Sequence, residues 1–131
     1  MDVKSLGCFK DTGRRAIPGV DGRYSLVKGY YRRRADAIKK CASVAMMLGH
    51  RCFGVQHQGW CATSRKACQT YGKYGRTNRC KNGKGGPWAN DVYRIYGELA
   101  LDAFHWLLTR VCKIQCALIN PFTPKSVKAQ N

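Results

Sequence analysis

One segment of the chain, residues 34–49, repeats apolar residues at helical spacing. The residues that fall on one face of such a helix are Ile38, Cys41, Ala42, Ala45 and Leu48. Gly49 follows at the position where a glycine commonly ends a helix in the left-handed conformation. The pattern predicts a helix over 34–48 that carries Cys41 into the core.

Shorter segments have the character of β-strands. Val92, Arg94 and Tyr96 alternate with Tyr93 and Ile95, as in a half-buried strand. A turn at 57–59 makes its two flanking segments partners in a hairpin. The expected strands are residues 5–10 at an edge, 51–56, 60–64 and 91–96. Residues 64–75 hold one helical turn that Gly72 and Gly75 end. These elements predict a small α+β domain, with one main helix packed on a short antiparallel sheet.

The composition changes after Tyr96. Residues 98–119 form a helical pattern rich in Leu, Phe and Trp, followed by a polar, proline-marked tail. The segment contains polar and charged residues that a membrane span rarely tolerates, namely Asp102, His105, Arg110, Lys113 and Gln115. We therefore divide the chain into a module, residues 1–96, and an appended C-terminal helix with its tail, residues 97–131.

The eight cysteines predict a disulfide-rich, extracellular domain. A zinc site is the competing interpretation, but the close C-x-x-C pairs typical of such sites are absent from the sequence. Six cysteines lie in the module, and Cys112 and Cys116 lie after it, so each part can close its own disulfides. The first ten residues lack the apolar core of a signal peptide. Three alternatives follow: a mature chain, a fragment of a secreted protein, or a different compartment.

The chain is strongly basic, with 24 Lys and Arg against 7 Asp and Glu and a net charge of +17. This excess favours anionic partners: nucleic acid, anionic lipid, or acidic and sulfated glycans. Zinc-finger, RNP and helix-turn-helix signatures are missing from the sequence, and disulfide-rich chains occur where nucleic acid is scarce, so glycans fit better. The alternative is a solvated basic surface without a specific partner.

The glycine-rich stretch at 81–90 resembles a phosphate-binding loop only superficially. Gly85 stands where Ser or Thr would follow the lysine of a P-loop, and Pro87 comes after it. A surface loop whose glycines have positive φ is the simpler interpretation. The histidines, carboxylates and serines form no catalytic pattern, and Cys61, four residues after His57, is expected in a disulfide. We predict neither an enzyme nor a cofactor or metal site.

Two tryptophans have polar neighbours of the kind that binds sugars. Trp60 follows Gln56 and Gln58, and Trp88 precedes Asn90 and Asp91. A flat ring can stack on the C–H face of a sugar while amides and carboxylates bind its hydroxyls, and tryptophan suits sites that are apolar at one end and wet at the other. The alternative is that both tryptophans are core residues, above all Trp60, which adjoins Cys61.

The order of these motifs resembles the WSC domain. The motifs are LGCFKD at 6–11, RAI at 15–17, IKKCA at 38–42, FGVQ at 53–56, GWCATS at 59–64, YGKYG at 71–75 and CKNGKGGPWANDVYRIY at 80–96. We associate the arrangement with secreted proteins of marine invertebrates and lower vertebrates. WSC domains are regarded as carbohydrate-binding modules, and the resemblance implies that role for residues 5–96.

The resemblance also implies a disulfide pairing. Cys52 and Cys68 are additional to the frame of the module, so we expect them to pair with each other. The other pairs are then Cys41 with Cys61, which joins helix to hairpin, and Cys8 with Cys80, which joins the first strand to the last loop. Spacing alone leaves the pairing open, because six cysteines allow fifteen connectivities.

We therefore expect a non-catalytic, lectin-like carbohydrate-binding module outside the cell, with some preference for acidic or sulfated glycans. The expected contact loop consists of Trp88, Asn90, Asp91 and Tyr93. Gln56 and Gln58 are candidates for the sugar hydroxyls, and Arg14, Arg15 and Lys84 for an acidic group. Two alternatives remain open: a cationic host-defence or toxin-like protein that acts on anionic membranes through residues 98–119, and a structural module of extracellular matrix.

Overall fold

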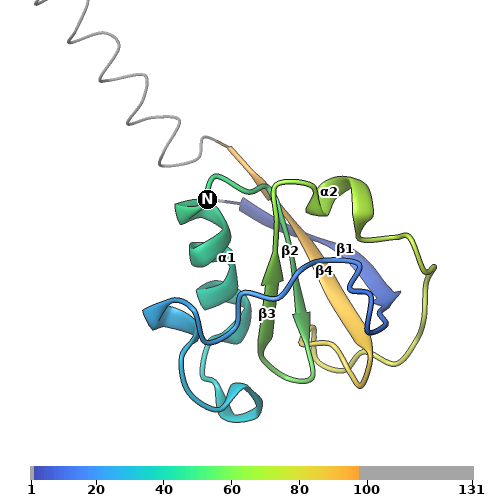
Figure 1. The fold of residues 1–131 in the computed structure, drawn as a ribbon, viewed down its shortest axis with the longest axis horizontal. Coiled ribbons are helices and arrows are strands. Elements are labelled where there is room, and N and C mark those ends of the chain that lie inside the picture. Colours follow the sequence, from blue (N-terminus) through green and yellow to red (C-terminus); the bar gives the residue numbers. More distant parts are fainter. Residues whose placement is uncertain (1, 98–131) are drawn as a thin grey trace, which may run out of the picture.

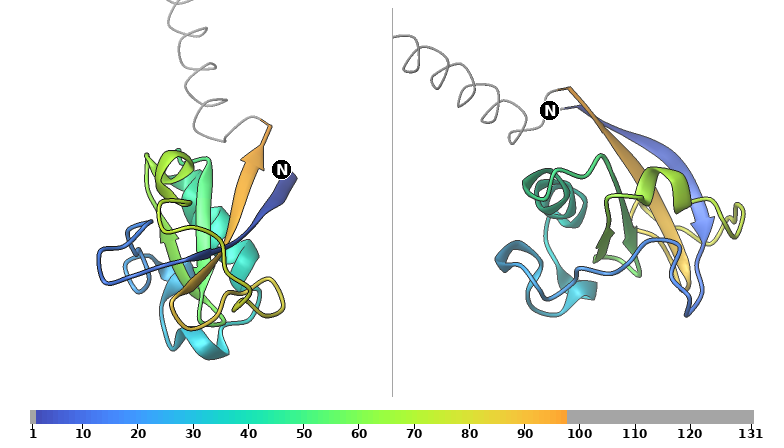
Figure 2. Two further views of the ribbon diagram at one scale, coloured as in Figure 1. Left: turned by 90° about the vertical axis from the view of Figure 1, so that its right-hand side faces the viewer. Right: turned by 45° about the horizontal axis from the view of Figure 1, so that its top comes forward.

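The four predicted strands lie in one antiparallel sheet, in the order β1-β4-β2-β3 (Figure 1). The computed structural model describes residues 2–97. The strands are β1 (Asp2–Lys10), β2 (Cys52–Gln56), β3 (Trp60–Thr63) and β4 (Ala89–Tyr96). β1 is an edge strand, as predicted, and pairs with β4 in a long twisted ribbon that extends past the shorter β2–β3 hairpin (Figures 1 and 2). The predicted small, disulfide-rich α+β domain is confirmed.

The main helix, α1 (Ala37–Met47), begins three residues later than predicted. Arg34 is extended and Asp36 is left-handed, with φ of 50°, so the chain turns before the helix starts. The end is as predicted. The N–H of Gly49 donates to the carbonyl of Met46 and that of His50 to Ala45, which is the hydrogen-bond pattern of a glycine-ended helix.

Three shorter helical elements lie in the connections. The predicted turn of helix is α2 (Ala67–Thr70), and two 3-10 turns precede α1, η1 (Ser25–Val27) and η2 (Tyr31–Arg33). Within residues 2–97, no helix is both long enough and apolar enough to cross a membrane. The predicted helix over 98–119, together with Cys112 and Cys116, lies outside the described residues.

Both faces of the sheet are covered, each by its own apolar cluster. On one face, α1 packs against Phe53, Val55 and Ile95. On the other face, Ile17 from the loop after β1 and Ala67 of α2 pack against Val92. β4 is therefore a central strand with two covered faces. The strand at 91–96 is present as predicted. It is not half-buried as expected, because Val92 and Tyr93, which point to opposite faces, are both buried.

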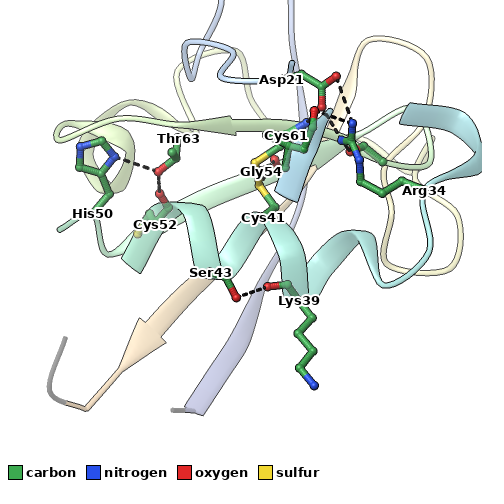
Figure 3. Close-up of a disulfide and its surroundings, with 12 residues drawn as sticks. Asp21, Arg34, Lys39, Cys41, Ser43, His50, Cys52, Gly54, Cys61 and Thr63 are labelled. Atoms are coloured by element: carbon green, nitrogen blue, oxygen red, sulfur yellow. Dashed lines mark hydrogen bonds and ion pairs between the residues drawn. A yellow bond between two sulfur atoms is a disulfide. The ribbon is translucent and has the colours of Figure 1, made fainter. Parts of the chain in front are cut away.

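Three disulfides hold this fold together, and their pairing is the one predicted. Cys8 pairs with Cys80, Cys41 with Cys61, and Cys52 with Cys68. Figure 3 shows the Cys41–Cys61 bridge, which joins α1 to the hairpin. Three disulfides in a domain of this size are typical of extracellular proteins.

The Cys8–Cys80 bridge is expected to contribute the most stability of the three. It closes a sequence separation of 72 residues, against 16 for Cys52–Cys68. In the chain-entropy description, these loops correspond to about 4 and about 3 kcal/mol, respectively. We therefore expect the Cys8→Ala/Cys80→Ala variant to lose more free energy of unfolding than Cys52→Ala/Cys68→Ala in urea titrations. The reverse order would contradict the prediction.

Candidate functional site

A hollow of about 230 Å³ lies where the β2–β3 hairpin meets two loops. The residues that line this aromatic hollow are Arg15, Tyr31, Gln56, His57, Trp60 and Trp88. The hairpin supplies Gln56, His57 and Trp60, because its tight turn sets Gln56 directly opposite Trp60. The others arrive from segments distant in sequence. The aromatic hollow therefore brings together three of the predicted site residues, Arg15, Gln56 and Trp88.

The guanidinium of Arg15 lies between the two tryptophans. Its central carbon is 4.4 Å from the ring centroid of Trp60 and 4.8 Å from that of Trp88. Its Nη1 donates to Asp11 Oδ2 at 2.9 Å and to Gln56 Oε1 at 3.2 Å. Asp11 is buried and its other carboxylate oxygen accepts the N–H of Ala16. Arg15 therefore positions both rings and the amide of Gln56, and its own charge is largely balanced by Asp11.

Trp60 is partly buried and has a structural as well as a surface role. It packs against the second apolar cluster. Its ring also lies against Gly19, where a β-carbon would collide with the indole. One side of the ring is thus supported by backbone while Arg15 contacts it in the hollow. Neither the core interpretation nor the sugar-site interpretation of Trp60 is sufficient alone.

Two residues of the hollow have left-handed backbone conformations. Trp88 has φ of 51° and His57 also has φ of 51°. Such conformations are costly for residues other than glycine, and they concentrate at functional sites. Trp88 is also 48% exposed, an unusual position for the largest apolar side chain. The fold therefore holds this indole at the surface on a strained backbone, which suggests a role other than packing.

The contact with Arg32 favours the neutral form of His57. Arg32 Nη2 donates to His57 Nε2 at 2.8 Å, so the ring proton lies on Nδ1. Burial lowers the pKa of His57 below its ordinary value, and the charge of Arg32 lowers it further. A neutral imidazole with a free N–H can donate a hydrogen bond to a ligand oxygen.

Three predicted contact residues are not available to a ligand. Asn90, Asp91 and Tyr93 are 0%, 8% and 8% exposed. The ring of Tyr93 stacks on Phe53 with centroids 5.3 Å apart, and its hydroxyl donates to the carbonyl of Gly83. Their assignment to a contact loop was wrong, because they belong to the central strand β4. Asn90 pairs with Gln56 in the sheet, and its amide makes no hydrogen bond within residues 2–97.

The glycine-rich loop is closed from within by a carboxylate. The N–H of Gly85 donates to Asp91 Oδ2 at 2.8 Å. Gly85 has φ of 70°, and a β-carbon there would lie 2.6 Å from the carbonyl oxygen of Ala89. The loop thus packs on the neighbouring strand ends. The carboxylate of Asp91 already accepts the hydrogen bond from the Gly85 N–H, which a bound phosphate would need. This agrees with the interpretation as a loop without a phosphate site.

The remaining predicted residues do not line the aromatic hollow. Gln58 is exposed and lines a neighbouring depression beside Pro87, which shares His57 with the hollow. Lys84 lines another, next to Asp36 and Asn82. Arg14 is exposed and contacts Tyr74 through its carbonyl. The sequence prediction missed Tyr31 and His57 and did not assign Trp60 to the site. The hairpin turn was the available signal for Trp60, because it pairs this residue with Gln56.

The buried carboxyl of Asp91 gives the module a pH dependence. Burial raises the pKa of Asp91, while the hydrogen bond from Gly85 partly opposes the shift. The pKa of Asp91 is higher in the folded state than in the unfolded state. Its contribution to the free energy of unfolding therefore falls as the pH rises from the unfolded-state pKa through the folded-state pKa. We expect Asp91→Asn to raise the melting temperature at neutral pH, by an amount that shrinks towards pH 3. A variant less stable than the natural chain at neutral pH would contradict this.

Burial and the nearby Asp91 together raise the pKa of Tyr93 to about 12. Removal of the Asp91 charge should therefore lower the pKa of Tyr93. An absorbance titration of tyrosinate in Asp91→Asn would measure the change.

Within residues 2–97, no group of three or more His, Cys, Asp or Glu side chains lies close enough together to hold a metal ion. Comparison with protein-family models, with curated proteins and with solved structures finds no match to this chain. The resemblance to the WSC domain stays a prediction.

Proposed function

We propose that residues 2–97 form a non-catalytic, extracellular carbohydrate-binding module that holds a sugar ring in the aromatic hollow. The observation that carries the proposal is Trp88, an indole kept half exposed on a left-handed backbone beside Trp60 and Arg15. Packing alone would favour a smaller residue or a glycine at this position, since both the exposure and the backbone conformation cost free energy.

The chemistry of the hollow suits a sugar. The half-exposed indole of Trp88 offers a flat apolar surface to the C–H face of a pyranose, and polar side chains around it can bind hydroxyls. His57 supplies an N–H and Tyr31 a hydroxyl at the wall, whereas Gln56, which is only 5% exposed, holds Arg15 in place through its amide oxygen. A pocket that is mostly apolar with a few convergent polar groups is the common form of small-ligand sites. The disulfides support an extracellular setting.

A glycan array tests the proposal. The full chain, refolded and oxidised, is applied to neutral and sulfated glycans at low salt and at about 0.15 M salt, where exposed charges more than about 8 Å apart are screened. We expect selective binding to a subset of glycans that survives the higher salt. An array without binding, or with binding to every sulfated glycan at low salt only, would overturn the proposal.

The membrane-active alternative depends on residues 98–119, which the structure does not describe. The matrix alternative predicts an array without binding. We therefore advance only the carbohydrate-binding function.

A further inference from the structure

A second depression, of about 320 Å³, lies beside the aromatic hollow and shares Arg15 with it. The polar side chains that line this basic groove are Arg15, Ser64, Arg65, Lys66, Thr70 and Lys73. Most of them come from the segment that leads from β3 into α2 and on to the following loop. None of the cations other than Arg15 belonged to the predicted site.

The basic groove has four cations at its wall and no carboxylate. The acidic residues within 2–97 are Asp2, Asp11, Asp21, Asp36 and Asp91. Asp11 is paired with Arg15, and the other four do not line the groove. Arg65, Lys66 and Lys73 make no salt bridge within the described part of the chain. Their charges are therefore available to attract an anion.

The groove is held in a fixed position relative to the hollow. The hydroxyl of Thr70 donates to the carbonyl of Ala16 at 2.5 Å, next to Arg15 in sequence. The Cys52–Cys68 disulfide ties α2 to the central strand β2. These two links position the basic side chains of α2 and its flanks against the segment that carries Arg15. The two depressions therefore adjoin at Arg15 in a fixed relative position.

Arg15 can serve both depressions at once. Its Nη1 is used by Asp11 and Gln56, whereas its Nε and Nη2 donate no hydrogen bond within residues 2–97. The hollow alone, at about 230 Å³, is smaller than the roughly 300–1,000 Å³ of typical small-molecule sites. A ligand that fills only the hollow would be a single ring. A ligand that crosses Arg15 would use the groove as well.

We infer that the glycan bound in the aromatic hollow is anionic, and that it extends across Arg15 into the basic groove. There a sulfate of the neighbouring sugar unit contacts Arg65, Lys66 and Lys73. This inference rests on the proposed function and specifies its substrate class. It also assigns the acidic group to residues other than Arg14 and Lys84, which the structure places elsewhere.

The test uses the full, oxidised chain and two probes, a heparin hexasaccharide and its fully desulfated form, in titrations at about 0.15 M salt. The groove variant is Arg65→Gln/Lys66→Gln/Lys73→Gln. A control variant, Arg23→Gln/Lys28→Gln/Lys39→Gln, removes the same charge from exposed positions that line neither depression. We expect the natural chain to prefer the sulfated probe. The groove variant should bind it about tenfold less tightly, which corresponds to about 1.4 kcal/mol in total for three exposed charge contacts.

The control variant should keep the preference, and both triple variants should bind the desulfated probe as the natural chain does. Equal weakening of sulfated-probe binding in the two triple variants would overturn the inference, because overall charge would then explain the preference. Equal affinity of the natural chain for both probes would also overturn it. The Trp88→Ala variant distinguishes failure of the inference about the basic groove from failure of the proposed carbohydrate-binding function. If that variant binds both probes unchanged, the aromatic hollow is not the sugar site.

Discussion

Trp88→Ala is expected to lower glycan affinity at least about thirtyfold, because truncation of an aromatic hot spot costs roughly 2 kcal/mol or more. The ring is 48% exposed and belongs to neither apolar cluster, so the domain should remain folded. The measurement is titration with the best glycan of the array, alongside thermal unfolding. Tyr96→Ala, which removes another exposed ring at 40% exposure, is the matched control and should bind normally.

A glycine at the same position gives an internal check on the backbone. Trp88→Gly and Trp88→Ala both lack the ring, so both should lose binding. Glycine accepts φ of 51° without a steric penalty, whereas alanine does not. The glycine variant should therefore be more stable than the alanine variant by about 1 kcal/mol. If Trp88→Ala unfolds the domain, the indole is structural; if it binds normally, the ligand lies elsewhere.

Arg34→Met is expected to cost about 3–5 kcal/mol of stability, because it leaves a buried carboxylate unpaired. The side chains of Arg34 and Asp21 are only 3% and 11% exposed, and they form a salt bridge (Figure 3). Arg34 also donates to the carbonyls of Gly59 and Val27, each at 2.7 Å. Asp21 in turn accepts the N–H of Cys61 at 3.1 Å. The pair thus joins the loop before α1 to the β2–β3 hairpin, which carries half of the aromatic hollow.

Urea unfolding measures this effect, and two further variants make it specific. Arg33→Met alters the exposed neighbour and should change stability by no more than about 0.5 kcal/mol. Asp21→Asn/Arg34→Met removes both charges and should recover part of the loss, because no ion is then left without a partner. A single Arg34→Met variant as stable as Arg33→Met would contradict the buried-pair argument.

The local elements of this fold could be predicted because their signals are short in range. The apolar spacing around Cys41 and the glycine at 49 define α1 and its end within a few residues. The turn at 57–59 defines the hairpin in the same way. The predicted helix began at residue 34, whereas Arg34 lies before α1 and forms a salt bridge with Asp21. The apolar spacing within 34–48 does not reveal this contact, because Asp21 lies outside that segment.

The candidate site was only partly predictable. The side-chain chemistry of Trp88, Gln56 and Arg15 indicated their role, and the structure brings them together. Asp91 and Tyr93 have equally suitable side chains, but they lie in a strand with neighbours on both sides. Whether a polar side chain meets solvent depends on what covers its strand, and alternation along one strand does not reveal that.

The sequence by itself determined the class of this protein: its strands, its main helix, its cysteine-rich framework and its strong positive charge. These follow from periodicity and composition, which each segment carries locally. Only the tertiary structure decided which of three consecutive arginines is buried, which cations are left without carboxylates, and that Arg15 lies between Trp60 and Trp88. The physical reason is that burial and pairing arise from contacts between residues far apart in the chain.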